Sequence, residues 1–503
     1  MSSDMFQELT APNGRKYTQP IGLFINNEWL KSSDGSTIAS VNPTNEETIT
    51  SVYAATEADV DKAVAAARAA LKNPTWRDMP GTERGKLMNK LAHLIEEHKE
   101  TLATIETWDN GKPYLVARDE DMSESSETIR YYSGYADKIF GQVIDTTPAK
   151  FAYTVREPVG VCGQIIPWNY PLSMAAWKLG PALACGNTVV LKPAEQTPLS
   201  ILYFATLVVK AGFPPGVINI INGLGSVTGS AIASHPGIDK VAFTGSTATA
   251  RQIMKTAAVN LKNITLETGG KSPLVVFNDA DLENAVEWAH IGIMSNQGQI
   301  CTATSRLLVQ SGIFDKFLSA FLAHVKSISK VGDPFDESTF QGPQVTKAQY
   351  ERIMSYVDIG KQEGAKLTMG GEPFAPSSKG FFIKPTVFTD VSPQMRIFQE
   401  EVFGPFVTIT RFETEDEAIT LANDSQYGLG SAIFTTDLTR AHSVARQIEA
   451  GMVWINSSND SDYRIPFGGV KQSGIGRELG EAGLSAYSNI KAVHVNMTVR
   501  SRM

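Results

Sequence analysis

The chain has 503 residues, of which 42% are hydrophobic and 19% are charged, with a formal net charge of −8. This length exceeds one ordinary hydrophobic core, so we expect two or more domains of a globular enzyme. Acidic and basic residues are mixed along the chain, which argues against a nucleic-acid partner, because that partner requires clustered Lys and Arg. No apolar run reaches the length of a membrane-spanning helix, so we expect no membrane partner either.

The first residues of the chain lack the charged and then apolar pattern of a signal peptide. The three cysteines, Cys162, Cys185 and Cys301, are an odd and sparse set, which indicates a reducing compartment rather than a disulfide framework. We therefore expect a cytoplasmic protein. The seven histidines are scattered without the spacing of zinc ligands, so we predict no metal site.

Two segments, 141–158 and 485–500, alternate like strands but have no neighbouring strands with which to form a sheet. Exposed strand edges promote unwanted association unless they are paired. We predict that the two segments pair with each other and with another subunit. The alternative is a surface hairpin in a monomer.

From residue 159 onward, short apolar runs alternate with helical patterns. The predicted strands cover 159–168, 188–193, 216–223 and 240–245. Apolar strands joined by helices of this length indicate parallel βαβ units in a doubly wound, nucleotide-binding arrangement. A second alternating stretch, from about 270 to 470, predicts a second α/β domain.

Polar residues follow two of the predicted strands. Lys192 and Glu195 come after one strand, where a carboxylate would accept hydrogen bonds from a ribose and repel a 2′-phosphate, which favours NAD over NADP. Gly245 ends another strand, and Ser246 can cap the helix that follows, whose free N–H groups suit a pyrophosphate. The alternatives are a solvated ion pair and an ordinary turn that binds nothing.

Two further residues suggest chemistry. Glu267 ends an apolar run and precedes two glycines, so its pKa could be raised to suit a general base. The alternative is a carboxylate that accepts backbone N–H bonds. Cys301 lies among small and polar residues in "SNQGQICTATSR" (295–306), whereas a structural cysteine prefers an apolar, well-packed setting. We therefore expect Cys301 to be presented to a ligand.

These residues belong to a series of motifs that resembles the aldehyde dehydrogenase superfamily over nearly the whole chain. In family order the motifs are "PWNYPL" (167–172), "LKPAEQTP" (191–198), "FTGST" (243–247), "ETGGKSP" (267–273), "NQGQIC" (296–301), "EEVFGP" (400–405) and "PFGGVKQSGIGRELGE" (466–481). The resemblance implies a Rossmann-type NAD-binding domain (1–140 and 159–269), an α/β catalytic domain (270–470) and a small β oligomerisation arm (141–158 and 485–503). It also implies a homodimer or homotetramer.

The resemblance implies a catalytic set. Cys301 would attack the aldehyde carbon to give a thiohemiacetal, and the Asn169 amide with the Cys301 backbone N–H would hold its oxyanion. Hydride transfer to the nicotinamide would leave a thioester. Glu267 would activate the water that hydrolyses it to a carboxylic acid, and Lys178 and Glu478 would pass the proton outward.

The resemblance also implies a set of contacts to NAD, with NADP as the less favoured alternative. These residues are Ile165, Ile166, Trp168, Lys192, Glu195, Gly225, Gly229, Phe243, Thr244, Gly245, Ser246, Thr268, Gln349, Arg352, Glu401 and Phe403. Two positions depart from the family pattern: Thr268 stands where leucine is usual, and Ala250 where glycine is usual. Neither departure removes a reacting group, but Ala250 bears on how closely its helix approaches the diphosphate.

For the substrate, several stretches resemble the betaine-aldehyde and aminoaldehyde branch, alongside general fungal-type aldehyde dehydrogenases. One such stretch is "WNYPLSMAAWKLGPALACG". That branch holds a cationic head group by cation–π attraction and carboxylates. The matching positions here are Tyr170, Trp177 and Phe467 for the aromatic cage, Asp121 and Glu124 for the acids, and Ser295 where an aromatic residue is common. We predict an amino- or trimethylammonio-aldehyde; the alternatives are an aromatic aldehyde such as indole-3-acetaldehyde, or an aliphatic one.

Two other functions fit the same fold. A CoA-acylating enzyme would release the thioester to CoA and typically lacks the base, so Glu267 argues against it. A catalytically silent binding or structural protein is opposed by the intact Cys301, Glu267 and Asn169. The last three residues, Ser501, Arg502 and Met503, are a variant of the peroxisomal Ser-Lys-Leu signal, so we also consider a peroxisomal pool beside an ordinary frayed tail.

Overall fold

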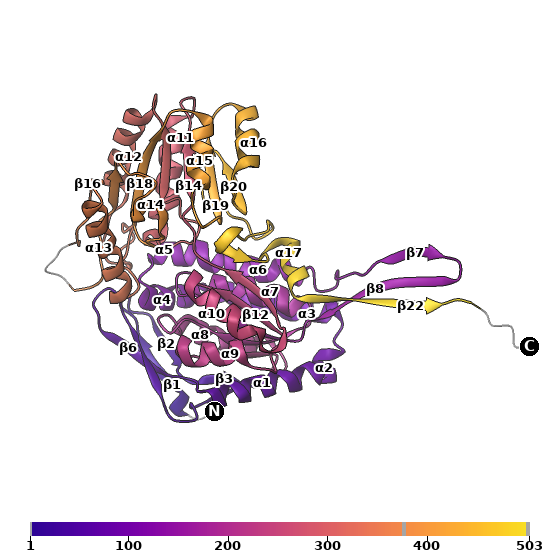
Figure 1. The fold of residues 1–503 in the computed structure, drawn as a ribbon. Coiled ribbons are helices and arrows are strands. Elements are labelled where there is room, and N and C mark those ends of the chain that lie inside the picture. Colours follow the sequence, from indigo (N-terminus) through magenta and orange to yellow (C-terminus); the bar gives the residue numbers. More distant parts are fainter. Residues whose placement is uncertain (1–2, 375–378, 499–503) are drawn as a thin grey trace, which may run out of the picture.

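The computed structural model describes residues 3–374 and 379–498. Two large sheets, each covered by helices, form two bodies, and a narrow three-stranded sheet projects from them (Figure 1). Among the described residues, no helix combines the length and the apolar character needed to cross a membrane. The predicted α/β fold with a small β arm is confirmed.

The first sheet has eight strands. In order across the sheet they are β21 (Gly474–Ile475), β13 (Asn263–Glu267), β12 (Lys240–Thr244), β9 (Val161–Ile165), β10 (Thr188–Lys192), β11 (Ile218–Ile220), β3 (Leu23–Ile25) and β4 (Glu28–Leu30). The strands from β13 to β11 run parallel, whereas β21, β3 and β4 pair antiparallel to their neighbours. All four predicted strands of this sheet are confirmed.

Strand order reverses around β9, because the chain first adds β10 and β11 on one side and then returns to add β12 and β13 on the other. Open α/β sheets bind ligands at the carboxyl ends of their strands beside such a reversal. Lys192, Thr244 and Glu267 are the last residues of β10, β12 and β13. The topology thus brings the polar strand ends of the sequence to one edge.

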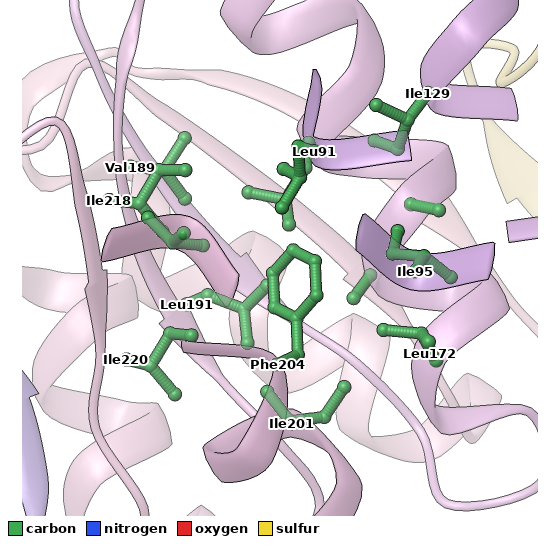
Figure 2. Close-up of a cluster of buried hydrophobic side chains, with 14 of the residues drawn as sticks. Leu91, Ile95, Ile129, Leu172, Val189, Leu191, Ile201, Phe204, Ile218 and Ile220 are labelled. Atoms are coloured by element: carbon green, nitrogen blue, oxygen red, sulfur yellow. The ribbon is translucent and has the colours of Figure 1, made fainter. Parts of the chain in front are cut away.

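Helices cover both faces of this sheet. The helices are α1 (Glu57–Lys72), α3 (Gly81–Glu97), α6 (Met122–Ser133), α7 (Pro171–Ala184), α8 (Leu199–Ala211), α9 (Ser230–Ser234) and α10 (Thr247–Ala257). Alternate residues of a strand point to opposite faces. Accordingly Val189 and Leu191 pack against the α3, α7 and α8 side, and Val190 packs with α1 on the other side. Figure 2 shows the first of these cores around Phe204, which is 1% exposed.

The second sheet has seven strands. In order they are β16 (Lys366–Met369), β17 (Thr386–Thr389), β18 (Phe406–Phe412), β15 (Arg306–Gln310), β14 (Pro273–Val276), β19 (Gly430–Phe434) and β20 (Met452–Ile455), of which only β16 is antiparallel to its neighbour within the described chain. Its main helices are α11 (Leu282–Met294), α12 (Phe314–Ile328), α13 (Lys347–Gln362), α15 (Glu415–Asn423) and α16 (Leu438–Gln447). The sequence did not predict β19, because "GSAIF" is too rich in small residues to stand out, although it lies in the interior of the sheet.

The projecting sheet consists of β7 (Val143–Thr147), β8 (Lys150–Pro158) and β22 (Ser488–Asn496) (Figure 1). β22 pairs antiparallel with β8 from Ser488 opposite Pro158 to Asn496 opposite Lys150. The predicted pairing of the two segments with each other is therefore confirmed. Their pairing with another subunit stays a prediction.

Candidate active site

A cavity of about 790 Å³ opens at the carboxyl edge of the first sheet and reaches the second body. It is lined by most of the residues that the sequence singled out: Asp121, Glu124, Trp168, Asn169, Tyr170, Trp177, Thr244, Gly245, Ser246, Glu267, Thr268, Ser295, Cys301, Gln349, Arg352, Glu401, Phe403, Phe467 and Glu478. The remaining predicted residues, Ile165, Ile166, Lys178, Lys192, Glu195, Gly225, Gly229 and Phe243, lie outside this lining.

The loop between α11 and β15 carries Cys301. Asn296 and Gln297 adopt positive φ angles of 47° and 58°, which turn the chain sharply after the helix. The backbone of Cys301 packs closely against Gly270, where an added Cβ would lie 2.3 Å from the Cys301 carbonyl oxygen. The side chain is partly exposed, as predicted. Burial, followed by the charges of Glu401 and Glu267, raises the pKa of the Cys301 thiol to about 12.

Glu267 is buried at the end of β13, with 2% of the residue exposed. Neither carboxylate oxygen has a hydrogen-bond partner among the described residues. Burial, followed by the charge of Glu478, raises the pKa of Glu267 well above its ordinary value. A carboxylate in such a setting is a stronger base than one in water, which suits it to remove a proton from a water molecule.

The amide of Asn169 is fixed by the loop that carries the cysteine. Asn169 Nδ2 donates to the backbone oxygen of Gln299 at 2.9 Å, and Asn296 Nδ2 donates to the backbone oxygen of Asn169 at 3.1 Å. Each segment therefore holds the other in place. An amide that is preorganised beside a nucleophile can stabilise a negative oxygen without reorganising.

Lys178 and Glu478 form a buried ion pair behind Glu267. Lys178 Nζ donates to both carboxylate oxygens of Glu478, at 2.7 and 2.9 Å, and to Thr244 Oγ1 at 2.7 Å. Lys178 is fully buried and reaches the cavity only through these partners, whereas Glu478 lines it. The predicted pair is thus assembled beside the buried base.

The helix N-terminus predicted to hold a pyrophosphate lies at the cavity wall. Ser246 caps α10 by accepting a hydrogen bond from the backbone N–H of Thr249. Thr247 and Ala248, in the first turn, line the cavity. A Cβ at position 245 would lie 2.6 Å from the Phe243 ring, so glycine permits this close turn.

Lys192 and Glu195 form a separate cluster with Gly225 and Gly229. Lys192 Nζ lies 3.2 Å from Glu195 Oε2. A Cβ added at Gly225 would lie 3.9 Å from Glu195 Oε1, and one added at Gly229 would lie 3.8 Å from Lys192 Cδ. A carboxylate beside an open glycine surface leaves room for a sugar, so the cluster fits the ribose of a dinucleotide.

The wall opposite α10 holds Glu401 and Phe403. Glu401 Oε1 accepts from the backbone N–H of Gly270 at 3.0 Å, and Arg352 donates to the Glu401 backbone oxygen at 2.8 Å. Gln349 Nε2 donates to the Phe403 backbone oxygen at 2.7 Å, and the Phe403 ring meets Trp168 edge-on at 5.3 Å. Burial raises the pKa of Glu401 to about 7.

Aromatic residues and acids form the far end of the cavity. Trp177 meets Phe467 edge-on with ring centroids 4.8 Å apart, and Trp177 Nε1 donates to Glu124 Oε1 at 3.1 Å. Burial, followed by the charge of Asp121, raises the pKa of Glu124 to about 7. Glu124 therefore carries a negative charge at this end when the pH exceeds neutrality.

Asp121 lines the cavity, as the sequence predicts, but its carboxylate is already paired. Asp121 forms a buried ion pair with Lys112, and the same Lys112 Nζ lies 3.7 Å from the centroid of the Tyr170 ring. An internal cation therefore neutralises Asp121 and occupies one face of Tyr170. Nothing in the spacing of the sequence pointed to Lys112.

Sequence reasoning also missed acidic residues near Glu124. Glu120 and Glu127 line the cavity together with Asp462 and Tyr463. Four and then three residues separate Glu120, Glu124 and Glu127, which is the spacing of one helix face. This spacing is a signal in the sequence from which Glu120 and Glu127 could have been predicted to lie beside Glu124. Glu127 pairs with Arg130 at 3.2 Å, and Asp462 pairs with Arg464.

A capped helix N-terminus and a partly exposed cysteine at one cavity are features typical of a dehydrogenase. The chain matches the aldehyde dehydrogenase family over residues 29–493 and belongs to that family. Its general activity is the oxidation of aldehydes.

Similar proteins agree with this membership. An aldehyde dehydrogenase from Emericella nidulans is 55% identical over 496 residues, which cover 98% of this chain and 99% of the relative. The NAD+ complex of an aldehyde dehydrogenase from Bacillus cereus has a TM-score of 0.93 at 48% identity, covering 95% of this chain and 97% of that chain. Betaine aldehyde dehydrogenase from Staphylococcus aureus, in complex with NAD+, has a TM-score of 0.94 at 44% identity, with 96% of each chain covered.

Proposed function

We propose that the protein is an NAD-dependent aldehyde dehydrogenase that converts an aldehyde to its carboxylic acid through a thioester on Cys301. One observation supports this most strongly. A partly exposed cysteine, a fixed amide and a buried carboxylate line one cavity, between a capped helix N-terminus and a pocket of aromatic and acidic residues.

The residues present fit NAD. The N-terminus of α10 would hold the diphosphate, Glu195 a ribose, and Glu401 with Phe403 the nicotinamide end. When bound, NAD supplies an acceptor for the hydride that the aldehyde carbon loses. The Glu195 carboxylate disfavours the 2′-phosphate of NADP, which therefore remains the secondary cofactor. The similar enzymes from Bacillus cereus and Staphylococcus aureus, both described in complex with NAD+, support this assignment.

The protein groups account for the remaining chemistry. The Cys301 sulfur bonds to the aldehyde carbon, and the Asn169 amide and the Cys301 backbone N–H stabilise the resulting oxyanion. After oxidation the carbon is a thioester. Glu267 takes a proton from water, whose oxygen bonds to the thioester carbon while the C–S bond breaks. The Cys301 sulfur leaves, and the carboxylic acid is released.

For the substrate, we propose an aldehyde with a cationic amino or trimethylammonio group. Glu124 and Glu120 face the cavity, and the described structure shows no ion pair for either. Trp177 and Phe467 offer aromatic faces to a cation that cannot donate hydrogen bonds. The similarity to betaine aldehyde dehydrogenase supports the same class.

A second candidate substrate class is an uncharged aromatic or aliphatic aldehyde. It is favoured by Lys112, which already lies on one face of Tyr170, and by the small Ser295 in place of an aromatic residue. Rates of NADH formation with betaine aldehyde, 3-aminopropanal, indole-3-acetaldehyde and hexanal distinguish the two. A higher kcat/KM for betaine aldehyde and 3-aminopropanal than for indole-3-acetaldehyde and hexanal supports the cationic class. A lower kcat/KM for the two cationic aldehydes supports the uncharged class.

Two controls separate the remaining alternatives. Product formation that requires CoA would identify a CoA-acylating enzyme. Labelling of Cys301 by iodoacetamide without loss of aldehyde oxidation would contradict the cysteine mechanism, and the absence of any turnover would point to a silent binding protein.

We also propose that the protein forms a homodimer or homotetramer through the arm, and that it acts in the cytoplasm. The exposed apolar side chains of the arm, such as Val143 and Ile490, support the assembly. The peroxisomal-type tripeptide Ser501-Arg502-Met503 lies outside the described residues. Fluorescence microscopy of the full chain, with and without this tripeptide, tests whether a peroxisomal pool exists.

A further inference from the structure

One face of strands β12 and β13 is polar although most of its side chains are buried. The two strands pair with Lys240 opposite Asn263, Ala242 opposite Thr265 and Thr244 opposite Glu267. Alternation along a strand places these six side chains on one face. The other face of the same strands packs into an apolar core through Val241, Phe243 and Leu266. We call Glu267, Thr265, Asn263, Thr244 and Lys240 the polar strip.

The polar strip extends from the active site to the surface. At one end Glu267 lines the cavity, and Thr244 accepts a hydrogen bond from Lys178 of the buried Lys178–Glu478 pair. At the other end Asn263 is exposed. Four residues of strand span about 13 Å. Buried polar groups are unfavourable unless they are paired. Ala242 separates the polar groups at the cavity end of the strip from those at its outer end, so other polar groups must connect the two ends.

Lys240 lies at the outer end of the strip. It is fully buried, and its Nζ donates to Thr265 Oγ1 at 2.7 Å and to Asn263 Oδ1 at 2.8 Å. No carboxylate lies within ion-pair distance of it in the described structure. Burial lowers the pKa of Lys240 to about 8, so this group can lose and regain a proton near neutral pH.

Further polar groups connect Lys240 with the ion pair. The Lys240 ammonium lies 4.9 Å from the ring centroid of Tyr487. Gln164 Nε2 donates to the Lys178 backbone oxygen at 2.8 Å and lies 3.4 Å from the Tyr487 hydroxyl. The other amide atom of this side chain, Gln164 Oε1, is buried without a hydrogen-bond partner among the described residues. The titratable groups whose charges act on Lys240 are Cys162, Glu478 and Lys178. An unpaired buried oxygen among polar groups is a typical site for an ordered water.

We propose that the proton released in thioester hydrolysis leaves the active site through the Lys178–Glu478 pair and reaches solvent at the outer end of the polar strip, with Lys240 as the last relay group. The proposal rests on the proposed function. The proton taken by Glu267 passes to the Lys178–Glu478 pair and, through ordered water, to Lys240. Lys240 gives up one of its own protons to water at Asn263. No electrons are transferred in these steps, and Lys240 touches neither substrate nor cofactor, so it is a positioning residue.

The test uses the full-length variant Lys240→Met, which keeps the length of the side chain and removes the titratable group. The first turnover of NADH formation should keep its rate and amplitude, because it precedes hydrolysis. The steady-state rate should fall about tenfold or more, within the range of general acid–base effects. Acyl-enzyme should accumulate on Cys301, and the limb of the kcat–pH profile near pH 8 should disappear.

Two further variants make the result specific. Lys262→Met is the matched control, since Lys262 is also buried beside β13 but its Nζ donates to the Ala233 backbone oxygen at 2.8 Å; it should leave the steady state and the pH profile unchanged. Thr265→Val interrupts the strip without removing a charge, and it should slow the steady state alone. It also keeps the proposal testable if Lys240→Met fails to fold.

A folded Lys240→Met or Thr265→Val enzyme with native steady-state rate and native pH profile would overturn the proposal. Equal loss of the first turnover and of the steady state would also overturn it, because Lys240 would then have only a structural role. Failure of the proposed function looks different: the wild-type chain would form no NADH with any aldehyde.

Discussion

At the scale of single residues, Cys301 and Glu267 both sit in surroundings that favour their uncharged forms. The pKa of the Cys301 thiol is raised to about 12, and that of Glu267 is raised as well. The thiol must therefore lose its proton before the sulfur bonds to the aldehyde, and the charges of Glu401 and Glu267 both oppose that loss. Both residues could be predicted from sequence by their motifs, but their electrostatic coupling depends on folding.

Removal of the nucleophile gives the first prediction. Cys301→Ala should abolish NADH formation and leave NAD binding intact, because the side chain contributes the reacting sulfur and none of the predicted cofactor contacts. Steady-state turnover and fluorescence titration with NAD measure the two effects. Retained turnover in Cys301→Ala would contradict the covalent mechanism.

Glu124 gives the second prediction, which concerns selectivity and its dependence on pH. Since the pKa of Glu124 is about 7, its carboxylate becomes charged as the pH rises through that value. The ratio of kcat/KM for betaine aldehyde to that for hexanal should therefore increase from pH 6 to pH 8. Glu124→Gln should flatten this increase. It should also raise KM for the cationic aldehyde several-fold, because the variant loses about 1 kcal/mol of attraction for the cation.

Glu127→Gln is the matched control for Glu124, because Glu127 lines the same cavity but already pairs with Arg130. It should leave the pH dependence in place. Equal effects of Glu124→Gln on both aldehydes would remove Glu124 from the head-group site.

At the scale of elements, the alternation of apolar runs with helical patterns predicted the four strands β9 to β12 at the centre of the first sheet, because each of them is buried on both faces. The same reasoning did not find β19, whose small residues depend on neighbouring strands for their conformation. The Lys112–Asp121 pair was equally inaccessible, since it forms only when α4 (Lys99–Asn110) and the turn before α6 pack together.

The third prediction concerns α11, the helix that precedes the loop of Cys301. His290 on this helix is 1% exposed and lies 2.8 Å from Ser329 Oγ, and burial lowers its pKa to about 4. Between pH 6.5 and 4 the unfolded chain binds this proton and the folded chain does not, so stability falls as the pH falls through that window. The loss is at most about 3 kcal/mol.

Denaturant unfolding of wild type and His290→Gln across this pH range measures the contribution. The variant should be less stable at pH 7, because a packed ring is lost, but its stability should depend less steeply on pH. Parallel pH curves for the two proteins would show that His290 is not the titrating group.

At the scale of the whole molecule, the arm is the part of the described chain for which we propose contact with another subunit. Val143 and Ile490 are 74% and 64% exposed on a sheet of three strands. The sequence predicted the segments of this sheet and their mutual pairing, because exposed alternating strands need partners. The proposed partner for the outer surface of the arm is a second chain, and the contacts between two chains are not specified by a single sequence.

The fourth prediction tests that second chain. The double change Val143→Glu and Ile490→Glu should shift the assembly to a smaller species in light scattering, because it places charges in an apolar contact. Leu438→Glu is the control, since Leu438 is 72% exposed on α16 in the other body, and it should leave the mass unchanged. A native mass in the double variant would show that the arm is not the interface.

The most direct test of the central claim is the mass of the cysteine peptide in a Glu267→Gln enzyme during turnover. We predict a single burst of NADH equal to the number of sites, followed by a rate at least about 100-fold below that of wild type, with Cys301 carrying the added mass of the acyl group. Continued turnover at the wild-type rate, or a burst without an acyl group on Cys301, would contradict the account.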